Sequence, residues 1–244
     1  MSHVFVNTGQ CGNQLGTALL GSLHEHLHAD HPAHWGCFFR RASNNSTKAY
    51  ARAVCIDTEP KVVTQCVERV NNGGGRGWLY DVKRVVYRHG GAGNNWAMGY
   101  AMCSGEFLDA SLDSIRAELE RCDRPPTLIL THSVAGGTGS GCGTRLTEAL
   151  ADAFADCTRV NLAVTPYHFG EVVVQHYNTV LCLAKVLACA SALCGRRACA
   201  RCVKDEGEES CSTSPLFLPV PHFPPYGEMC SPLRCRSPPR PTPW

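Results

Sequence analysis

The chain has 244 residues, of which 44% are hydrophobic and 18% are charged, so it can bury a sizeable core in one large domain or two small ones. Its formal net charge of +2 argues against nucleic-acid or membrane-surface binding driven by bulk charge. We find no run of about 18 apolar residues, and no basic region followed by an apolar core at the N-terminus. We therefore expect no membrane span, no signal peptide and a cytoplasmic location.

The first 70 residues alternate strand-like and helix-like segments. Residues 4–6 form a short β-branched and aromatic run. It is followed by leucines spaced to line one face of a helix: Leu15, Leu19, Leu20, Leu23 and Leu27. Residues 53–56 form a second apolar run, and Pro60 suits the first turn of a helix that follows it. That helix has one apolar face, made by Val62, Val63, Cys66, Val67 and Val70.

The same alternation continues to about residue 190. A stripe with 4-3-4-3 spacing predicts a helix through Leu108, Leu112, Ile115, Leu119 and Cys122. The segment PPTLILTHS at 125–133 predicts a buried strand, 146–154 a helix and 159–164 another strand, and a last helix begins near Tyr177. Strands that alternate with helices predict an α/β fold with a Rossmann-like parallel sheet and flanking helices.

The composition changes after about residue 193. Ten of the fifteen prolines lie in residues 194–244, and seven of the sixteen cysteines lie between Cys189 and Cys235. Proline at this density prevents helices and central strands. We therefore expect a folded domain over residues 1–193 and a disordered Cys/Pro-rich tail over 194–244. In a reducing compartment the cysteines are expected to be free thiols that pack as small hydrophobic groups.

The segment SVAGGTGSGCGT, at 133–144, places a glycine-rich run between a strand and a helix. Bare peptide N–H groups and the positive end of the helix dipole make an anion site, most naturally for phosphates. Gly136, Gly137 and Gly139 would supply backbone donors, and Thr138 and Ser140 would add hydroxyl donors. The run has no lysine, which excludes the ordinary P-loop, and its spacing fails the dinucleotide pattern. A flexible turn is the alternative.

Four more polar or glycine-rich loops follow predicted strands, at 9–14, 57–60, 91–97 and 166–171. The carboxyl ends of parallel strands meet at one edge of a sheet, so these loops and the run at 136–141 predict one shared site. Gln10 and Asn94 can donate from their side-chain amides. Asp57 and Glu59 would repel phosphate, so we expect them to hold Mg²⁺ through water. The alternative for Glu59 is a carboxylate favoured by a helix N-terminus.

The segments GQCGNQLG, DTEP, AGNNWA and GGTGSG, in this order and at these separations, resemble the tubulins. The resemblance covers roughly residues 1–190. It implies that guanine nucleotide (GTP) is held on backbone amides and magnesium in place of a P-loop lysine. It also implies that Gln10, Cys11 and Asn94 lie near the nucleotide and that Thr138 and Gly139 lie at the phosphates. Glu59 is then expected near the magnesium ion.

Within this family the chain looks most like the delta type. Ala135 stands where alpha and beta chains have a further glycine, and residues 166–178 resemble the delta type. Gln175 replaces a glutamate that contacts the ribose in alpha and beta chains, and its amide can still bond a sugar hydroxyl. The resemblance implies a cytoskeletal role at centrioles, basal bodies or cilia, with other tubulin subunits as partners.

The resemblance fails after about residue 190. Ala198 stands where an asparagine would contact the guanine, and the long central helix and later domains have no counterpart. We therefore expect a truncated chain that does not polymerise and hydrolyses GTP slowly at most, because the completing acidic loop is missing. A splice or frameshift product is one hypothesis for the tail. A second hypothesis makes its P-x-x-P segments an interaction module. Cys199 and Cys202 form one C-x-x-C without a second pair, so we expect no structural metal.

Overall fold

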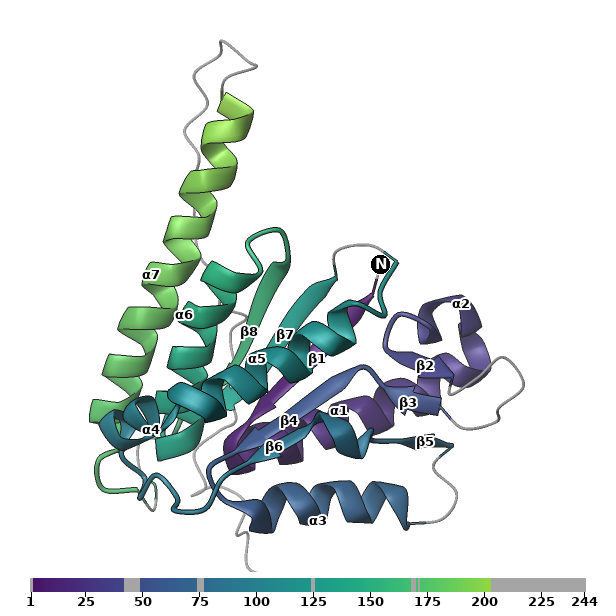
Figure 1. Cartoon of the computed structure of the whole chain (residues 1–244), viewed down its shortest axis with the longest axis horizontal. Coiled ribbons are helices and arrows are strands. Elements are labelled where there is room, and N and C mark those ends of the chain that lie inside the picture. The colour runs from purple at the N-terminus through teal and green to yellow at the C-terminus, as the bar shows by residue number, and fades with distance from the viewer. Residues whose placement is uncertain are drawn as a thin grey trace, which may run out of the picture. The chain divides into compact units, whose positions relative to one another are not determined.

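The computed structural model describes residues 2–41, 49–73, 77–123, 126–167, 170 and 172–202. Its centre is a five-stranded sheet in the order β6-β4-β1-β7-β8, in which every neighbouring pair is parallel. The strands are β1 (His3–Thr8), β4 (Ala53–Asp57), β6 (Val85–Tyr87), β7 (Thr127–Ser133) and β8 (Thr158–Val164). The predicted parallel α/β sheet is therefore confirmed (Figure 1).

Successive side chains of the strands point to opposite faces of the sheet, and on each face they form part of one apolar cluster. Val4 and Val6 of β1 pack with helices α5 (Gly105–Leu119) and α6 (Gly143–Ala153), whereas Phe5 packs with α1 (Gly9–Asp30) and α3 (Pro60–Asn71). The helices therefore cover the sheet from both sides (Figure 1). This two-sided burial explains why β1 and β4 are continuous apolar runs in the sequence.

A small second sheet lies beside α1 and α3, in the order β2-β3-β5. It comprises β2 (Phe39–Arg41), β3 (Ala49–Ala51) and β5 (Trp78–Leu79). The short helix α2 (Pro32–Trp35) precedes β2, and the 3₁₀ helix η1 (Val82–Arg84) follows β5 and contacts α5 and β4. Phe39 and Trp78 are buried in the cluster formed by α1 and α3. These strands have two or three residues each, too few to give a recognisable period, and the sequence analysis does not predict them.

Three further helices follow the loops at the carboxyl edge of the main sheet. They are α4 (Trp96–Met102), the π-helical turn η2 (Thr138–Cys142) and α7 (Gln175–Cys202), and α7 runs beside α6 (Figure 1). Helix α7 crosses the domain boundary predicted after residue 193. Residues 194–202 contain no proline, and their alanines and arginines favour a helix. The predicted tail from 203 to 244, with its P-x-x-P segments, lies outside the described residues.

The described part of the chain has no helix that is both long and apolar enough to cross a membrane. Ten cysteines are described with their side chains, and all ten are free thiols. Five of them, including Cys55, Cys142 and Cys182, are buried in the apolar clusters, as expected of thiols that pack as small hydrophobic groups. The side chains of Cys199 and Cys202 lie outside the described residues.

Candidate nucleotide site

The order in which strands are added to the sheet changes sides at β1. From β1 the chain builds β4 and β6 on one side, and it then crosses to the other side for β7 and β8. In open parallel sheets this crossover leaves a crevice at the carboxyl ends of the two strands, where ligands bind. The glycine-rich segments at 9–14 and 134–139 follow β1 and β7. The first of them, predicted as a loop, forms the first turns of α1, which begins directly after β1. The topology therefore brings the two predicted loops together.

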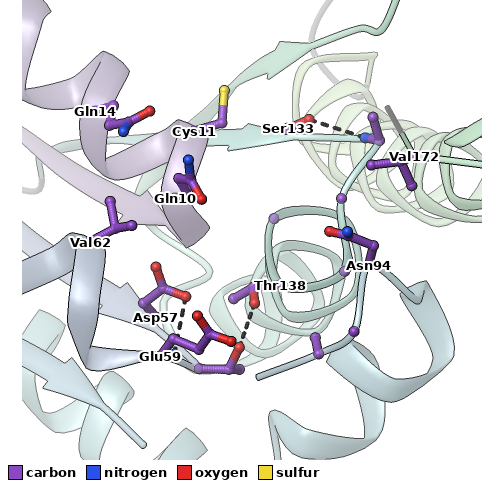
Figure 2. Close-up of a pocket in the computed structure, with 17 residues that line it drawn as sticks. Gln10, Cys11, Gln14, Asp57, Glu59, Val62, Asn94, Ser133, Thr138 and Val172 are labelled. Atoms are coloured by element: carbon purple, nitrogen blue, oxygen red, sulfur yellow. Dashed lines mark hydrogen bonds between the residues drawn. The ribbon is translucent and has the colours of Figure 1, made fainter. Parts of the chain in front are cut away.

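A cavity of about 530 Å³ lies at this edge of the sheet. Nine of the eleven predicted site residues line it: Gln10, Cys11, Asp57, Glu59, Asn94, Gly136, Gly137, Thr138 and Gly139. Val172, just beyond the predicted loop at 166–171, also lines it, so segments that follow all five strands of the sheet contribute. Figure 2 shows Asp57, Glu59 and Thr138 at one end of the cavity and Cys11 and Val172 at the other.

Two glycines of the run allow the loops to pack against one another. A Cβ atom on Gly137 would lie 2.8 Å from the Ala92 Cβ and from the Asn95 nitrogen. A Cβ atom on Gly139 would lie 2.8 Å from the Ser133 oxygen. Either side chain would force the backbones apart, since contacts this short do not occur at a real Cβ. The glycines therefore serve loop packing as well as access to the peptide amides.

The residues that line the cavity include two carboxylates and no lysine, arginine or histidine. The cavity can therefore hold an anion through backbone and side-chain amides, hydroxyl groups and a bound cation. The Thr58 and Thr138 hydroxyl groups lie 2.5 Å apart and link the loop after β4 to η2. Asn94, at the far side of the cavity, has a left-handed backbone with φ of 53°. This conformation is tolerated by asparagine better than by most side chains.

Asp57 and Glu59 fit a magnesium ion. Burial raises the pKa of Asp57 to about 6, and its Oδ1 accepts a hydrogen bond from the Glu59 N–H at 3.4 Å. A buried carboxylate without a basic partner is stabilised by a divalent cation, and Mg²⁺ commonly uses one or two carboxylates together with phosphate oxygens and water. Among the described residues, no group of three or more His, Cys, Asp or Glu side chains is arranged so that it could hold a metal ion by itself. The pair is therefore suited to a shared, nucleotide-dependent ion.

Two of the predicted residues do not line the cavity. Ser140 is fully buried, and its hydroxyl donates to the Gly136 carbonyl within the same turn. Gln175 is also buried, and its Nε2 donates to the Tyr167 carbonyl at 3.1 Å, which fastens the loop after β8. In this structure both side chains are used to hold loops in place. Local hydrogen bonds of this kind compete with contacts to a ligand.

Burial raises the pKa of the Cys11 thiol, so this residue is a neutral thiol and not an activated nucleophile.

The structure also adds lining residues that the sequence analysis did not select: Gln14, Thr58, Val62, Ala92, Gly93, Ser133 and Ala135. Gln14 could have been found, because it lies four residues after Gln10 on the same face of α1. Most of the others lie in the segments that the sequence analysis singled out, at 57–60, 91–97 and 133–144, but were not selected individually, and Val62 is apolar.

Glycine-rich loops at the carboxyl ends of a doubly wound parallel sheet define a nucleotide-binding class of α/β protein. Comparison with known families makes this specific. The chain belongs to the Tubulin/FtsZ family, whose GTPase domain matches residues 2–194. The resemblance drawn from the four short motifs is therefore confirmed.

Curated relatives include tubulin delta chains. Those of Mus musculus and Homo sapiens are each 35% identical to this chain, over 205 and 206 residues, and the alignments cover 79% of this chain and 44% of each relative. The tubulin beta-1 chain of Colletotrichum gloeosporioides is 35% identical over 193 residues, which cover 73% of this chain and 42% of that relative. The chain thus spans less than half the length of these relatives.

Proposed function

We propose that this chain binds a guanine nucleotide together with Mg²⁺ in the cavity at the carboxyl ends of β1 and β7. The observation that carries the proposal is the convergence of five chain segments, each following a strand of the sheet, on one cavity that has peptide amides, hydroxyl groups and two carboxylates but no basic side chain. Membership of the Tubulin/FtsZ family supports the choice of a guanine nucleotide. The absence of a basic lining residue supports the joint requirement for a divalent cation.

The two ends of the cavity suit different parts of a nucleotide. The backbone of Gly136, Gly137 and Gly139 and the Thr138 hydroxyl would hold phosphate oxygens at the end that carries the carboxylates. Bound Mg²⁺, held by Asp57 and Glu59, would neutralise part of the charge of those phosphates. At the opposite end, Cys11 and Val172 offer apolar surface for the sugar and base (Figure 2).

The proposal is tested by titrating GTP and ATP into the full chain, with and without Mg²⁺, and by following thermal unfolding. At a concentration of 100 times Kd, GTP with Mg²⁺ should raise Tm by roughly 5–10 °C, because a ligand bound only to the folded state stabilises it. ATP should give a smaller shift, and removing Mg²⁺ should reduce the shift with GTP. Equal shifts for both nucleotides, or none, would contradict the proposal.

A matched pair of substitutions tests the magnesium role. Asp57→Asn removes the buried carboxylate, whereas Asp113→Asn removes an exposed carboxylate of α5 that pairs with Arg116. Asp57→Asn should lower the Mg²⁺-dependent part of the GTP affinity about tenfold or more, since a charged ligand of the ion is lost. Asp113→Asn should leave it unchanged. If both variants keep the full Mg²⁺ dependence, Asp57 does not hold the ion.

We further propose that the chain acts in the cytoskeleton, at centrioles, basal bodies or cilia, together with other tubulin-family subunits. The similarity to tubulin delta chains and the delta-like segment at 166–178 support this role. Expression of the tagged full chain beside a centriole marker tests it. Uniform staining of the cytosol, with no enrichment at centrioles or ciliary bases, would overturn the proposed location.

A further inference from the structure

We propose that Asn178, in the first turn of α7, is a positioning residue for the nucleotide site. It does not line the cavity, yet its carboxamide joins two of the loops that do. We infer that it couples these loops to α7, so that nucleotide binding and the docking of α7 stabilise each other. The inference rests on the proposed nucleotide binding and concerns how the site is held in shape.

The side chain of Asn178 is buried and makes three hydrogen bonds to backbone groups. Its Nδ2 donates to the Asn94 carbonyl at 2.8 Å and to the Ala135 carbonyl at 2.7 Å. Its Oδ1 accepts from the Trp96 N–H at 2.9 Å. Asn94 and Ala135 line the cavity from different loops, more than 40 residues apart in sequence. One carboxamide therefore fixes the relative position of both loops and of the first amide of α4.

The three partners determine which way the carboxamide points. An NH₂ group can serve two carbonyl acceptors, and the oxygen can serve one N–H donor. The reversed orientation would place the oxygen against two carbonyls and the NH₂ group against an N–H group. Only an amide satisfies this arrangement of two acceptors and one donor. A carboxylate at this position could accept from Trp96 but could donate to neither loop.

Holding these carbonyls also orients neighbouring amides. The carbonyl of Ala135 and the N–H of Gly136 belong to one planar peptide unit and point in opposite directions. Fixing the carbonyl therefore fixes the direction of the Gly136 N–H, at a residue that lines the cavity. Across the cavity, Asn94 has a φ of 53°, a conformation that persists only where surrounding contacts hold it. The bond from Asn178 to its carbonyl is one such contact.

The packing of helix α7 holds the carboxamide of Asn178 in position. Asn178, Cys182 and Val186 follow one another at four-residue intervals, so they share the buried face of α7. Cys182 and Val186 pack with Val134, the residue before Ala135 in the loop after β7. The apolar contact and the hydrogen bonds therefore bind the same loop to the same helix face. Because coupling between two equilibria is reciprocal, a nucleotide that orders the loops must also stabilise the docking of α7.

The experiment compares three variants of the full chain by calorimetric titration with GTP and Mg²⁺. Asn178→Asp keeps the size and the bond from Trp96, and Asn178→Ala removes all three bonds without adding a charge. Val186→Ala is the matched control, because it weakens the packing of α7 against Val134 but leaves the three hydrogen bonds of Asn178 in place. Both Asn178 variants should bind GTP about ten- to a hundredfold more weakly than the wild type, and Val186→Ala within threefold, even where its Tm is lowered equally.

Hydrogen exchange of the wild type gives an independent readout that does not depend on a variant that folds. GTP with Mg²⁺ should slow amide exchange in residues 178–186 of α7, outside the cavity. Wild-type binding without this protection, or Asn178 variants that bind no worse than Val186→Ala, would overturn the inference while the proposed function stands. Failure of the wild type to bind GTP would overturn the proposed function and this inference with it.

Discussion

Strands β7 and β8 are neighbours of seven residues each, paired in parallel along their whole length, yet they are buried in opposite ways. Leu128 and Leu130 of β7 are fully buried beneath α5 and α6. In β8, Val160, Leu162 and Val164 are 36–40% exposed. Equal length, full pairing and similar apolar content do not decide burial. What decides it is whether another element covers each face, and β8 lies at an edge of the sheet.

The covered face of β8 is held by polar contacts. Arg159 Nη1 donates to the Phe154 carbonyl at 2.9 Å, to the Leu150 carbonyl of α6 at 3.3 Å and to the Cys157 carbonyl in the connection after α6 at 3.4 Å. Asn161 Oδ1 lies 3.3 Å from both His132 Nε2 and Thr147 Oγ1. Apart from Ala163, which packs against the apolar cluster of Val134, Cys182 and Val186, the covered face of β8 is therefore polar and its exposed face is apolar, unlike the usual edge strand. The stability of this strand should depend on specific bonds more than on burial.

The comparison is tested most strongly by the same substitution in both strands. Leu130→Ala should lower the free energy of unfolding by about 3–5 kcal/mol, because it leaves a cavity in the core. Leu162→Ala should lower it by less than about 1 kcal/mol, because the side chain is already partly in water. Urea unfolding of both variants measures the difference. Equal losses would show that Leu162 is covered in solution.

A smaller effect is expected from the polar bonds of β8. Arg159→Met keeps most of the side-chain length but removes the bonds to α6, and it should cost about 1–3 kcal/mol. The control is Arg145→Met, which removes a more exposed ion pair to Glu148 at 3.6 Å and should cost less than about 1 kcal/mol. If the two arginine variants unfold at the same urea concentration, the polar attachment of β8 contributes little.

The weakest of the three effects depends on pH and on His132, a buried residue of β7 whose Nε2 lies 3.3 Å from Asn161 Oδ1 of β8. Burial lowers the pKa of this imidazole below its ordinary value of 6.5. As pH falls below 6.5 the unfolded chain takes up a proton that the folded chain does not, so folding stability decreases. His132→Gln should reduce this dependence by up to about 1.4 kcal/mol per pH unit. Parallel pH profiles for wild type and variant would exclude His132 as the cause.

Much of the fold follows from local sequence patterns. The runs at 4–6, 53–56, 125–133 and 159–164 correspond to β1, β4, β7 and β8, because each is long or apolar enough to stand out. Strand β6 and the small sheet have only two or three residues per strand and give no such signal. The π-helical form of η2 is set by packing between loops, which no local pattern in the glycine run specifies.

The sequence predicts which residues line the cavity better than it predicts the hydrogen bonds that their side chains make. Parallel-sheet topology alone requires the loops to meet, which is why nine of the eleven selected residues line the cavity. Ser140 and Gln175 point elsewhere because a nearby carbonyl competes for each side chain. The role inferred for Asn178 could not be read from the sequence, since its partners are backbone groups far along the chain.

Trp96 lies where several of these features meet. Its peptide N–H is bonded to Asn178, its indole Nε1 donates to Thr144 of α6 at 3.2 Å, and its ring stacks on Tyr100. Two other tryptophans, Trp35 and Trp78, belong to the cluster on the opposite face of the sheet. The emission spectrum of Trp96, isolated by replacing the other tryptophans with phenylalanine, would therefore give an optical signal from the seam between α4, α6 and α7 without any added dye.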